Sequence, residues 1–164
     1  MPQGTFKSDI TKWVAKAKGN VRAVAKKIVF DLGTTIITRT PVDTGRLVGN
    51  WQYAEDHIPG GTFDVAGSRE QAEAQFAAAL ASFEVGHRSY FINNLPYGPV
   101  VEYGLYPNPP KIGSKKRGES TPTIHVINGY STQAPAGMVR ITVVEFQQFV
   151  AQAVNDVDQL RRAS

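Results

Sequence analysis

The sequence contains no cysteine, which excludes disulfide bonds, thiolate zinc sites and cysteine nucleophiles together. Its three histidines, His57, His87 and His125, lie far apart, and no two of them have the spacing that is typical of metal ligands. We therefore predict no metal site and no cofactor. No apolar run approaches the roughly 20 residues that cross a membrane, and the polar N-terminus does not resemble a signal peptide.

Catalytic signatures are also missing. The chain has no G-x-S-x-G elbow, no Walker loop and no dinucleotide-binding glycine pattern. Glu102, beside Tyr97 and Tyr103, forms the one polar and aromatic cluster that suggests an active site. No second carboxylate or histidine is near it in sequence for acid–base catalysis. We interpret Glu102 as a buried or subunit-spanning carboxylate bonded to a tyrosine or arginine, and we predict that the protein is not an enzyme.

The 164 residues are enough for one domain, and 41% hydrophobic and 20% charged residues are ordinary for a globular protein. The formal net charge of +4 is unevenly distributed. Residues 7–39 hold eight basic side chains against Asp9 and Asp31, which gives +6, so the rest of the chain carries −2. The position of the charge is therefore more informative than its total.

The basic segment has the periodicity of a long helix from Ser8 to about Thr38, after a loose arm of residues 1–7. Its apolar stripe consists of Ile10, Trp13, Val14, Ala17, Val21, Val24, Ile28 and Leu32. The basic residues on the opposite arc have two interpretations, an ordinary solvated face or a positive surface toward DNA or an acidic partner. The candidate DNA-facing residues are Lys12, Lys16, Arg22, Lys26 and Lys27.

Turn residues separate the next elements. Thr40-Pro41 ends the first helix, and Asp43, Thr44 and Gly45 form a turn in which Asp43 offers a side-chain bond and Gly45 allows a positive φ. A first strand is expected over 47–58, followed by a short strand or loop over 62–66. Ser68 then begins a helix as the first residue of a capping box with Gln71, and this helix runs to about residue 83.

Residues 90–104, YFINNLPYGPVVEYG, organise the chain. The aromatic and β-branched start predicts a strand, and Asn93-Asn94 ends it because short amides bond nearby backbone and tolerate left-handed dihedrals. The residue before Pro96 is held extended. A single helical turn is expected from Pro99 to Tyr103, with Gly104 as its left-handed stop.

This stretch, together with TPVDTGRL at 40–47 and APAGMVR at 134–140, resembles the tail-completion proteins of long-tailed bacteriophages. These form the gene-product-ten-like neck family, to which the minor tail protein Z of lambda is a functional relative. The three blocks stand in the order of the family and span nearly the whole chain. The matching residues are Asp43, Thr44, Gly45, Asn93, Asn94, Pro96, Tyr97, Glu102, Tyr103, Gly104, Pro135 and Gly137.

The resemblance implies a virion structural protein without catalysis. It implies a homo-oligomeric ring, by analogy a hexamer, at the head-proximal end of the tail. That ring would complete the tail and join it to the head connector, next to the tail terminator or tail tube protein and with DNA in its lumen. Such a protein is made in the host cytoplasm and ends in the neck of the virion. We expect no membrane partner.

The chain departs from the family over about residues 105–128, where proline, glycine and basic residues predict a protruding loop inserted into the single domain 1–164. Thr123–Ile127 alternates like a returning strand, with Asn128-Gly129 as its turn. The candidate interface residues here are Lys111, Lys115, Lys116 and Arg117.

The last helix is expected over about 138–161. Its apolar seam consists of Val139, Val143, Phe146, Val150, Ala153, Val157 and Leu160. Ile141 and Val144 fall on the reverse face and are further candidate interface residues, because rings bury a second face. Together the elements predict an α+β fold with a long N-terminal helix, a small, mostly antiparallel sheet with an intervening helix, and a long C-terminal helix.

Two functions compete. The first is the neck or tail-completion protein, which would associate with tail tubes in fixed stoichiometry. The second is a small basic nucleic-acid-binding protein that uses the first helix and the Lys111–Arg117 loop, and whose binding would depend strongly on salt. An enzyme of unknown class is a third reading, for which no residue set is found.

Overall fold

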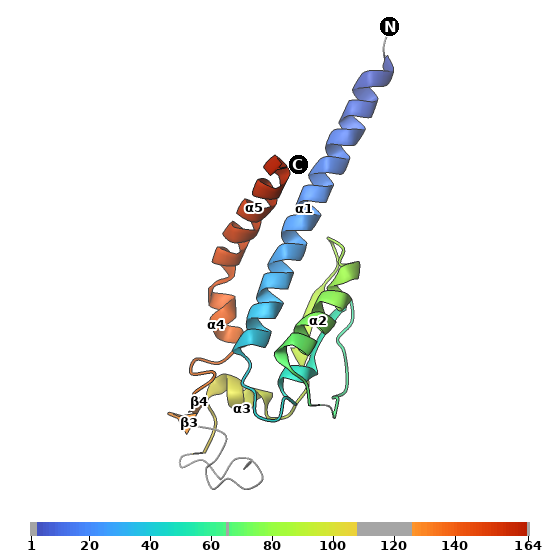
Figure 1. Cartoon of the computed structure of the whole chain (residues 1–164). Coiled ribbons are helices and arrows are strands. Elements are labelled where there is room, and N and C mark those ends of the chain that lie inside the picture. Colours follow the sequence, from blue (N-terminus) through green and yellow to red (C-terminus); the bar gives the residue numbers. More distant parts are fainter. Residues whose placement is uncertain (1–2, 65, 108–125, 164) are drawn as a thin grey trace.

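In a computed structural model, the chain is built along one long helix, α1 (Gln3–Arg39) (Figure 1). The structure describes residues 3–64, 66–107 and 126–163. Helix α2 (Arg69–Ala79) lies on one side of α1, and α5 (Phe146–Ala163) runs back along the other side, so that both termini point the same way. The α+β architecture predicted from the sequence is confirmed.

Helix α1 is longer than predicted. It includes residues 3–7, which we expected to be a loose arm, and it passes through Gly19-Asn20 without a break. Its end at Arg39, before Thr40-Pro41, is as predicted. Thr40 is fully buried: its hydroxyl donates to the Ile36 carbonyl (2.7 Å) and accepts the Trp51 indole N–H (2.8 Å), which ties the end of the helix to the sheet.

The sheet is a ribbon of two antiparallel strands, β1 (Trp51–Glu55) and β2 (Ser89–Asn93), with α2 between them in sequence. The capping box of α2 is confirmed: the Gln71 N–H donates to the Ser68 hydroxyl (3.2 Å), and the Ser68 N–H donates to the Gln71 side chain (3.0 Å). A short 3-10 turn, η2 (Leu80–Ser82), follows α2. The ribbon therefore carries its own covering helix.

The first core cluster lies between α1, α2 and this ribbon. Phe76 is its centre, because its ring contacts Phe91 (centroids 4.8 Å apart), Tyr53 (5.6 Å) and Phe30 (6.2 Å). Gly33 of α1 makes room for it, since a Cβ there would lie 2.3 Å from the Phe76 ring. The buried members are Ile37, Val48, Ala72, Phe76, Leu80 and Phe83.

The first strand is shorter than the predicted 47–58. The 3-10 turn η1 (Val48–Asn50) precedes β1, because the buried Asn50 amide donates to the carbonyls of Arg46 (2.7 Å) and Phe63 (2.9 Å) and holds the chain in a turn. Asp56 ends the strand at a positive φ of 58°. In the described part of 62–66, residues 62–64 and 66, there is no strand; the segment is a loop.

A second core cluster lies around α3 (Gly98–Tyr103). As predicted, β2 ends at Asn93 and α3 stops at Gly104, whose φ is 65°. The returning strand is confirmed for its described part as β3 (Val126–Ile127), which pairs with β4 (Tyr130–Ser131) across the predicted Asn128-Gly129 turn. The buried members of this cluster are Leu47, Leu95, Val101, Ala134 and Met138.

The last helix is broken, contrary to the prediction of one helix over 138–161. Helix α4 (Val139–Val144) is capped by Glu145, and α5 begins at Phe146. The Arg39 guanidinium donates to both Glu145 carboxylate oxygens (2.9 Å each) and to the Thr142 hydroxyl (2.9 Å). The helix is therefore interrupted at Glu145, and the predicted apolar seam is not continuously buried. Ala153 is buried in it, but Val143 and Leu160 are 59% and 69% exposed.

Candidate functional site

Glu102 joins two of the three sequence blocks that carry the family resemblance. Glu102 is only 7% exposed. Its carboxylate accepts hydrogen bonds from the backbone N–H groups of Met138 (2.7 Å), Val139 (2.9 Å) and Arg140 (2.9 Å). These are first N–H groups of α4, which have no partner inside the helix. Burial of Glu102 disfavours its charged form, but the N–H groups of Arg140, Val139 and Met138 outweigh that effect and lower its pKa.

Arg140 completes the junction from the other side. Its guanidinium donates to the Glu102 carboxylate (3.3 Å), to the Glu102 carbonyl (2.7 Å) and to the Tyr130 hydroxyl (3.2 Å), and it lies 4.8 Å from the centre of the Tyr103 ring. The interpretation of Glu102 as a buried carboxylate that bonds an arginine is confirmed. Arg140 itself was in the motif but not among the predicted site residues.

The glycines of the motif permit this close packing. Gly137 has a φ of 83°, and a Cβ there would lie 2.6 Å from the Glu102 carbonyl oxygen. A Cβ on Gly104 would lie 2.4 Å from the Tyr130 ring. Pro135, the remaining predicted residue of this block, is exposed and forms an isolated bridge with Gly137. Both glycines are thus required by neighbours that are distant in sequence.

The first block, TPVDTGRL, packs against the same unit through Asn93. The Asn93 side chain donates to the Leu47 carbonyl (2.8 Å) and accepts the Leu95 N–H (3.2 Å). Asn94 donates to the carbonyls of Pro59 (3.1 Å) and Gly61 (2.9 Å). The two amides hold separate loops, and neither has the left-handed dihedral that the sequence suggested.

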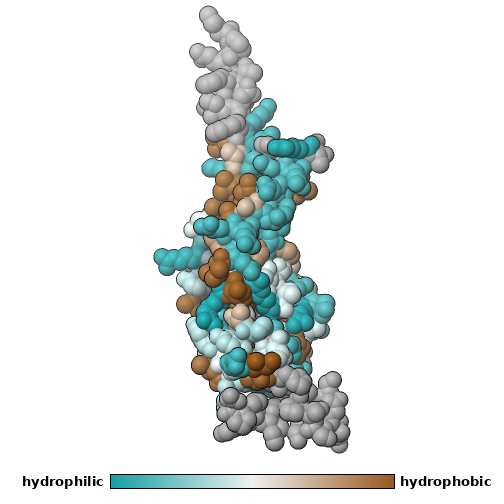
Figure 2. All heavy atoms as spheres, turned by 90° about the vertical axis from the view of Figure 1, so that its left-hand side faces the viewer, coloured by the Kyte–Doolittle hydropathy of each residue, from teal (hydrophilic) through white to brown (hydrophobic). Residues whose placement is uncertain are grey.

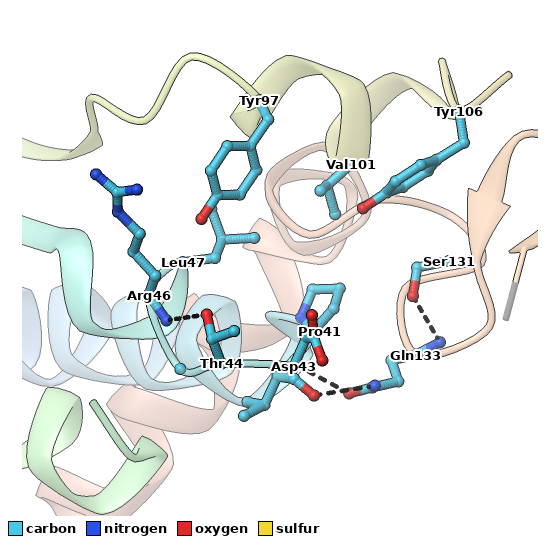
Figure 3. Close-up of a pocket in the computed structure, with 12 residues that line it drawn as sticks. Pro41, Asp43, Thr44, Arg46, Leu47, Tyr97, Val101, Tyr106, Ser131 and Gln133 are labelled. Atoms are coloured by element: carbon cyan, nitrogen blue, oxygen red, sulfur yellow. Dashed lines mark hydrogen bonds between the residues drawn. The ribbon is translucent and has the colours of Figure 1, made fainter. Parts of the chain in front are cut away.

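A pocket of about 350 Å³ opens where this block meets Tyr97 (Figure 3). Leu47 and Val101 supply apolar wall, and the phenols of Tyr97 and Tyr106 face inward from the α3 side. Burial raises the pKa of both phenols. On the opposite wall the Gln133 amide bonds both the N–H (2.9 Å) and the carbonyl (3.2 Å) of Val42.

The turn in this wall is closed differently from the prediction. The Thr44 hydroxyl accepts the Arg46 N–H (3.4 Å), whereas the exposed Asp43 carboxylate makes no hydrogen bond to the described residues. Gly45 has the predicted positive φ, 82°, and its carbonyl accepts the N–H groups of Gly49 (3.0 Å) and Gly67 (3.2 Å). Pro96, from the second block (residues 90–104), is exposed and directly precedes Tyr97.

Three of the five candidate DNA-facing residues contact their own chain. Arg22 pairs with Glu84 (2.8 Å), and Lys26 donates to the Ala81 carbonyl (3.3 Å). Lys27 of α1 pairs with Asp31 on the same helix (2.7 Å) and with Asp156 of α5 (3.2 Å). Its hydrogen bond to Asp31 is the main reason that its pKa is raised. Lys12 and Lys16 are exposed.

The outer side of α4 and α5 presents apolar side chains to solvent. Figure 2 faces this side of the molecule and shows separate hydrophobic patches among polar residues. Val144 is 80% exposed and Phe146 is 46% exposed, while Ile141 is half-buried. The other candidate interface residues, Lys111, Lys115, Lys116 and Arg117, lie outside the described residues, as does His125.

Over residues 3–64, 66–107 and 126–163, no group of three or more His, Asp or Glu side chains is arranged to hold a metal ion. Within the same ranges no helix is long and apolar enough to span a membrane. Comparison of the chain with protein-family models, curated proteins and solved structures gives no significant match.

Proposed function

We propose that this chain is a structural protein of a long-tailed bacteriophage, which forms a ring at the head-proximal end of the tail, completes the tail and joins it to the head connector. One observation carries the proposal. The three sequence blocks that resemble the neck family, far apart in the chain, fold into one unit through Glu102, Asn93 and Gly137. Proteins that share one fold are expected to share the residues that hold its parts together.

The motif residues are used for architecture. The Glu102 carboxylate accepts three backbone N–H groups and the Arg140 side chain, so its oxygens are directed at its own chain. Exposed apolar residues such as Val143 and Val144 are instead available to other subunits. The partners in this proposal are further copies of the chain in a hexameric ring, the tail terminator or tail tube protein, and the connector, around DNA in the lumen.

Nucleic-acid binding is the second candidate, favoured by the exposed Lys12 and Lys16 on a helix segment of net charge +6. A protein that binds through phosphates loses affinity steeply with salt, with a slope close to the number of phosphates that it neutralises. Because Arg22, Lys26 and Lys27 contact their own chain, we expect only a shallow slope. A steep slope would favour this second function.

The direct experiment is electron microscopy of lysates from the parent phage with an early stop codon in this gene. The proposal predicts filled heads and finished tails that accumulate unjoined, or tails that are malformed at the upper end. Supplying the intact protein from a plasmid should restore joined particles. Normal virions without the protein would rule the role out.

A further inference from the structure

The first part of α1 is a helix with almost no support from its own chain. Figure 1 shows that α1 extends well past the end of α5. Of the side chains described between Thr11 and Gly19, only Ala17 is not exposed. In proteins most of the stability of a helix comes from packing of its apolar face rather than from intrinsic propensity. The like charges of Lys12 and Lys16, four residues apart, weaken this segment further. A partner is therefore expected to cover it.

One face of α1 is unpartnered along this length. Lys12, Lys16, Gly19 and Ala23 follow one another at four- and three-residue steps, which places them on a single side of the helix, and all four are exposed. We call this the outer face of α1. A Cβ on Gly19 would meet no atom within 4 Å. Another helix can therefore approach closely here, with lysines at one end of the contact.

The charge distribution indicates which partner fits. Residues 7–39, which make up most of α1, carry a net charge of +6. Residues 146–164, which contain α5, carry no net charge. The remaining described residues, 40–64, 66–107 and 126–145, hold four arginines against nine carboxylates, a net charge of −5. Within the described residues, the part of a second copy that contains α2 is thus opposite in net charge to the outer face of α1.

The acidic part holds a second exposed helix face of matching shape. On α2, Ala72 and Phe76 are buried, as is Leu80 of the following η2 turn, so the opposite side of α2 faces solvent. That side carries Glu70 in the first turn, followed by Ala74 and Ala78, all of them exposed. We call it the outer face of α2. In a parallel contact, Glu70 lies toward Lys12 and Lys16, and the alanines lie toward Gly19 and Ala23.

We propose that the outer face of α1 in one copy docks on the outer face of α2 in the next copy. The proposal rests on the proposed function, since it names the contact that builds the ring. Two different surfaces of one chain form a heterologous interface, which repeats and closes into a ring when the rotation allows. DNA is a poorer occupant, because phosphates make no use of the small residues Gly19 and Ala23.

The absence of cysteine makes a cross-linking test clean. Two chains are prepared, one with Ala23→Cys and one with Ala78→Cys, and their mixture is oxidised. Disulfides form only when the two Cβ atoms come within about 4.5 Å, so a mixed dimer reports the contact. Asn155→Cys, exposed on the side of α5 away from buried Ala153, replaces Ala78→Cys in the control mixture.

We expect mixed dimers well above the control, and a ladder that stops at the ring size when one chain carries both cysteines. Lys12→Glu with Lys16→Glu should lower the yield about fivefold, a loss of roughly 1 kcal/mol. Glu70→Lys in the partner chain should restore it. Circular dichroism of each variant checks that the helices still form. A yield equal to the control overturns the proposal.

The outcomes separate this inference from the proposed function. If the native chain sediments as a ring but the 23–78 pair does not cross-link, the contact is wrong and the ring remains. If unjoined heads and tails do not accumulate without the protein, the function fails whatever the cross-links show. If the lysine variant loses duplex DNA binding and the 23–78 pair gives no cross-link, the outer face of α1 binds nucleic acid and the self-association proposal is overturned.

Discussion

Replacing Glu102 with glutamine tests whether the carboxylate holds α4 in place. The charged group accepts three backbone N–H groups from residues 138–140, whereas glutamine keeps the size but offers one acceptor oxygen and turns an NH₂ donor toward the helix. One or two N–H groups then lose their acceptor, at about 1–3 kcal/mol each. The favourable charge at the helix N-terminus, worth roughly 0.3–1 kcal/mol, is lost as well.

We therefore expect Glu102→Gln to lower the free energy of unfolding by about 2–4 kcal/mol, a large share of the roughly 5–15 kcal/mol of a typical domain. Urea denaturation measures this as a lower midpoint with an unchanged slope. Glu84→Gln is the matched control, since its carboxylate is about half exposed in an ion pair with Arg22 and such pairs contribute about 0–1 kcal/mol.

The pH dependence supplies an independent check. Because folding lowers the pKa of Glu102 below 4.5, its contribution is fully present above pH 4.5 and is lost as the pH falls through the folded-state value. Glu102→Gln should remove that part of the acid sensitivity and leave the rest. Equal midpoints for wild type and variant, or an unaltered acid profile, would show that the carboxylate does not support α4 in this way.

Three further variants test the packing around the site. Gly137→Ala should destabilise the protein by about 2 kcal/mol or more, because Gly137 has a positive φ and a Cβ there would meet a carbonyl oxygen. Gly60 lies in open space, so Gly60→Ala is the control and should change the stability by no more than about 0.5 kcal/mol. Thermal melting measures both. Trp51→Phe removes the indole N–H that donates to the buried Thr40 hydroxyl. We expect urea titration to show a free energy of unfolding lower by about 1–3 kcal/mol, and no decrease if solvent replaces the bond. The exposed pair His87–Asp56 raises the pKa of His87 above 6.5, so its contribution is complete below pH 6.5 and is lost as the pH rises through the folded value. His87→Gln should make the melting temperature less dependent on pH in that window. An unchanged dependence on pH would show that the His87–Asp56 pair is not its cause.

The features that depend only on residues close together in the sequence were predicted correctly. The capping box of Ser68 and Gln71 and the left-handed stop at Gly104 need only residues adjacent in sequence. The burial of Glu102 followed from a similar argument, since a lone carboxylate among aromatics lacks a catalytic partner. What the sequence did not reveal is which N–H groups it meets, because residues 138–140 are more than thirty positions away.

The break at Glu145 shows the limit most clearly. Residues 139–160 have an unbroken four- and three-residue apolar pattern, so periodicity alone predicts one helix. The pattern is overridden by Arg39, about a hundred residues earlier, which bonds Thr142 and Glu145. Asn50 is a second case, because its bonds to two carbonyls replace the first residues of the predicted strand with a turn. Neither contact leaves a local signal.

Helix α4 is held at both ends by charged groups of other elements, and this suggests why a buried carboxylate is present at all. Glu102 holds its N-terminus, and Arg39 at the end of α1 holds its C-terminal end. A buried charge is a weak source of stability compared with an apolar side chain, but its directional bonds can fix one orientation. We infer that the pair sets where α5 lies against α1.

Amide hydrogen exchange can separate orientation from stability. If Glu102 fixes α4, Glu102→Gln should increase exchange in α4 and α5 through local opening, while α2, which packs in the other core cluster, keeps its protection. Val48→Ala, in that other cluster, is the control and should loosen α2 instead. A uniform rise across all helices in Glu102→Gln would mean that the carboxylate supplies stability to the whole chain and no particular direction to α5.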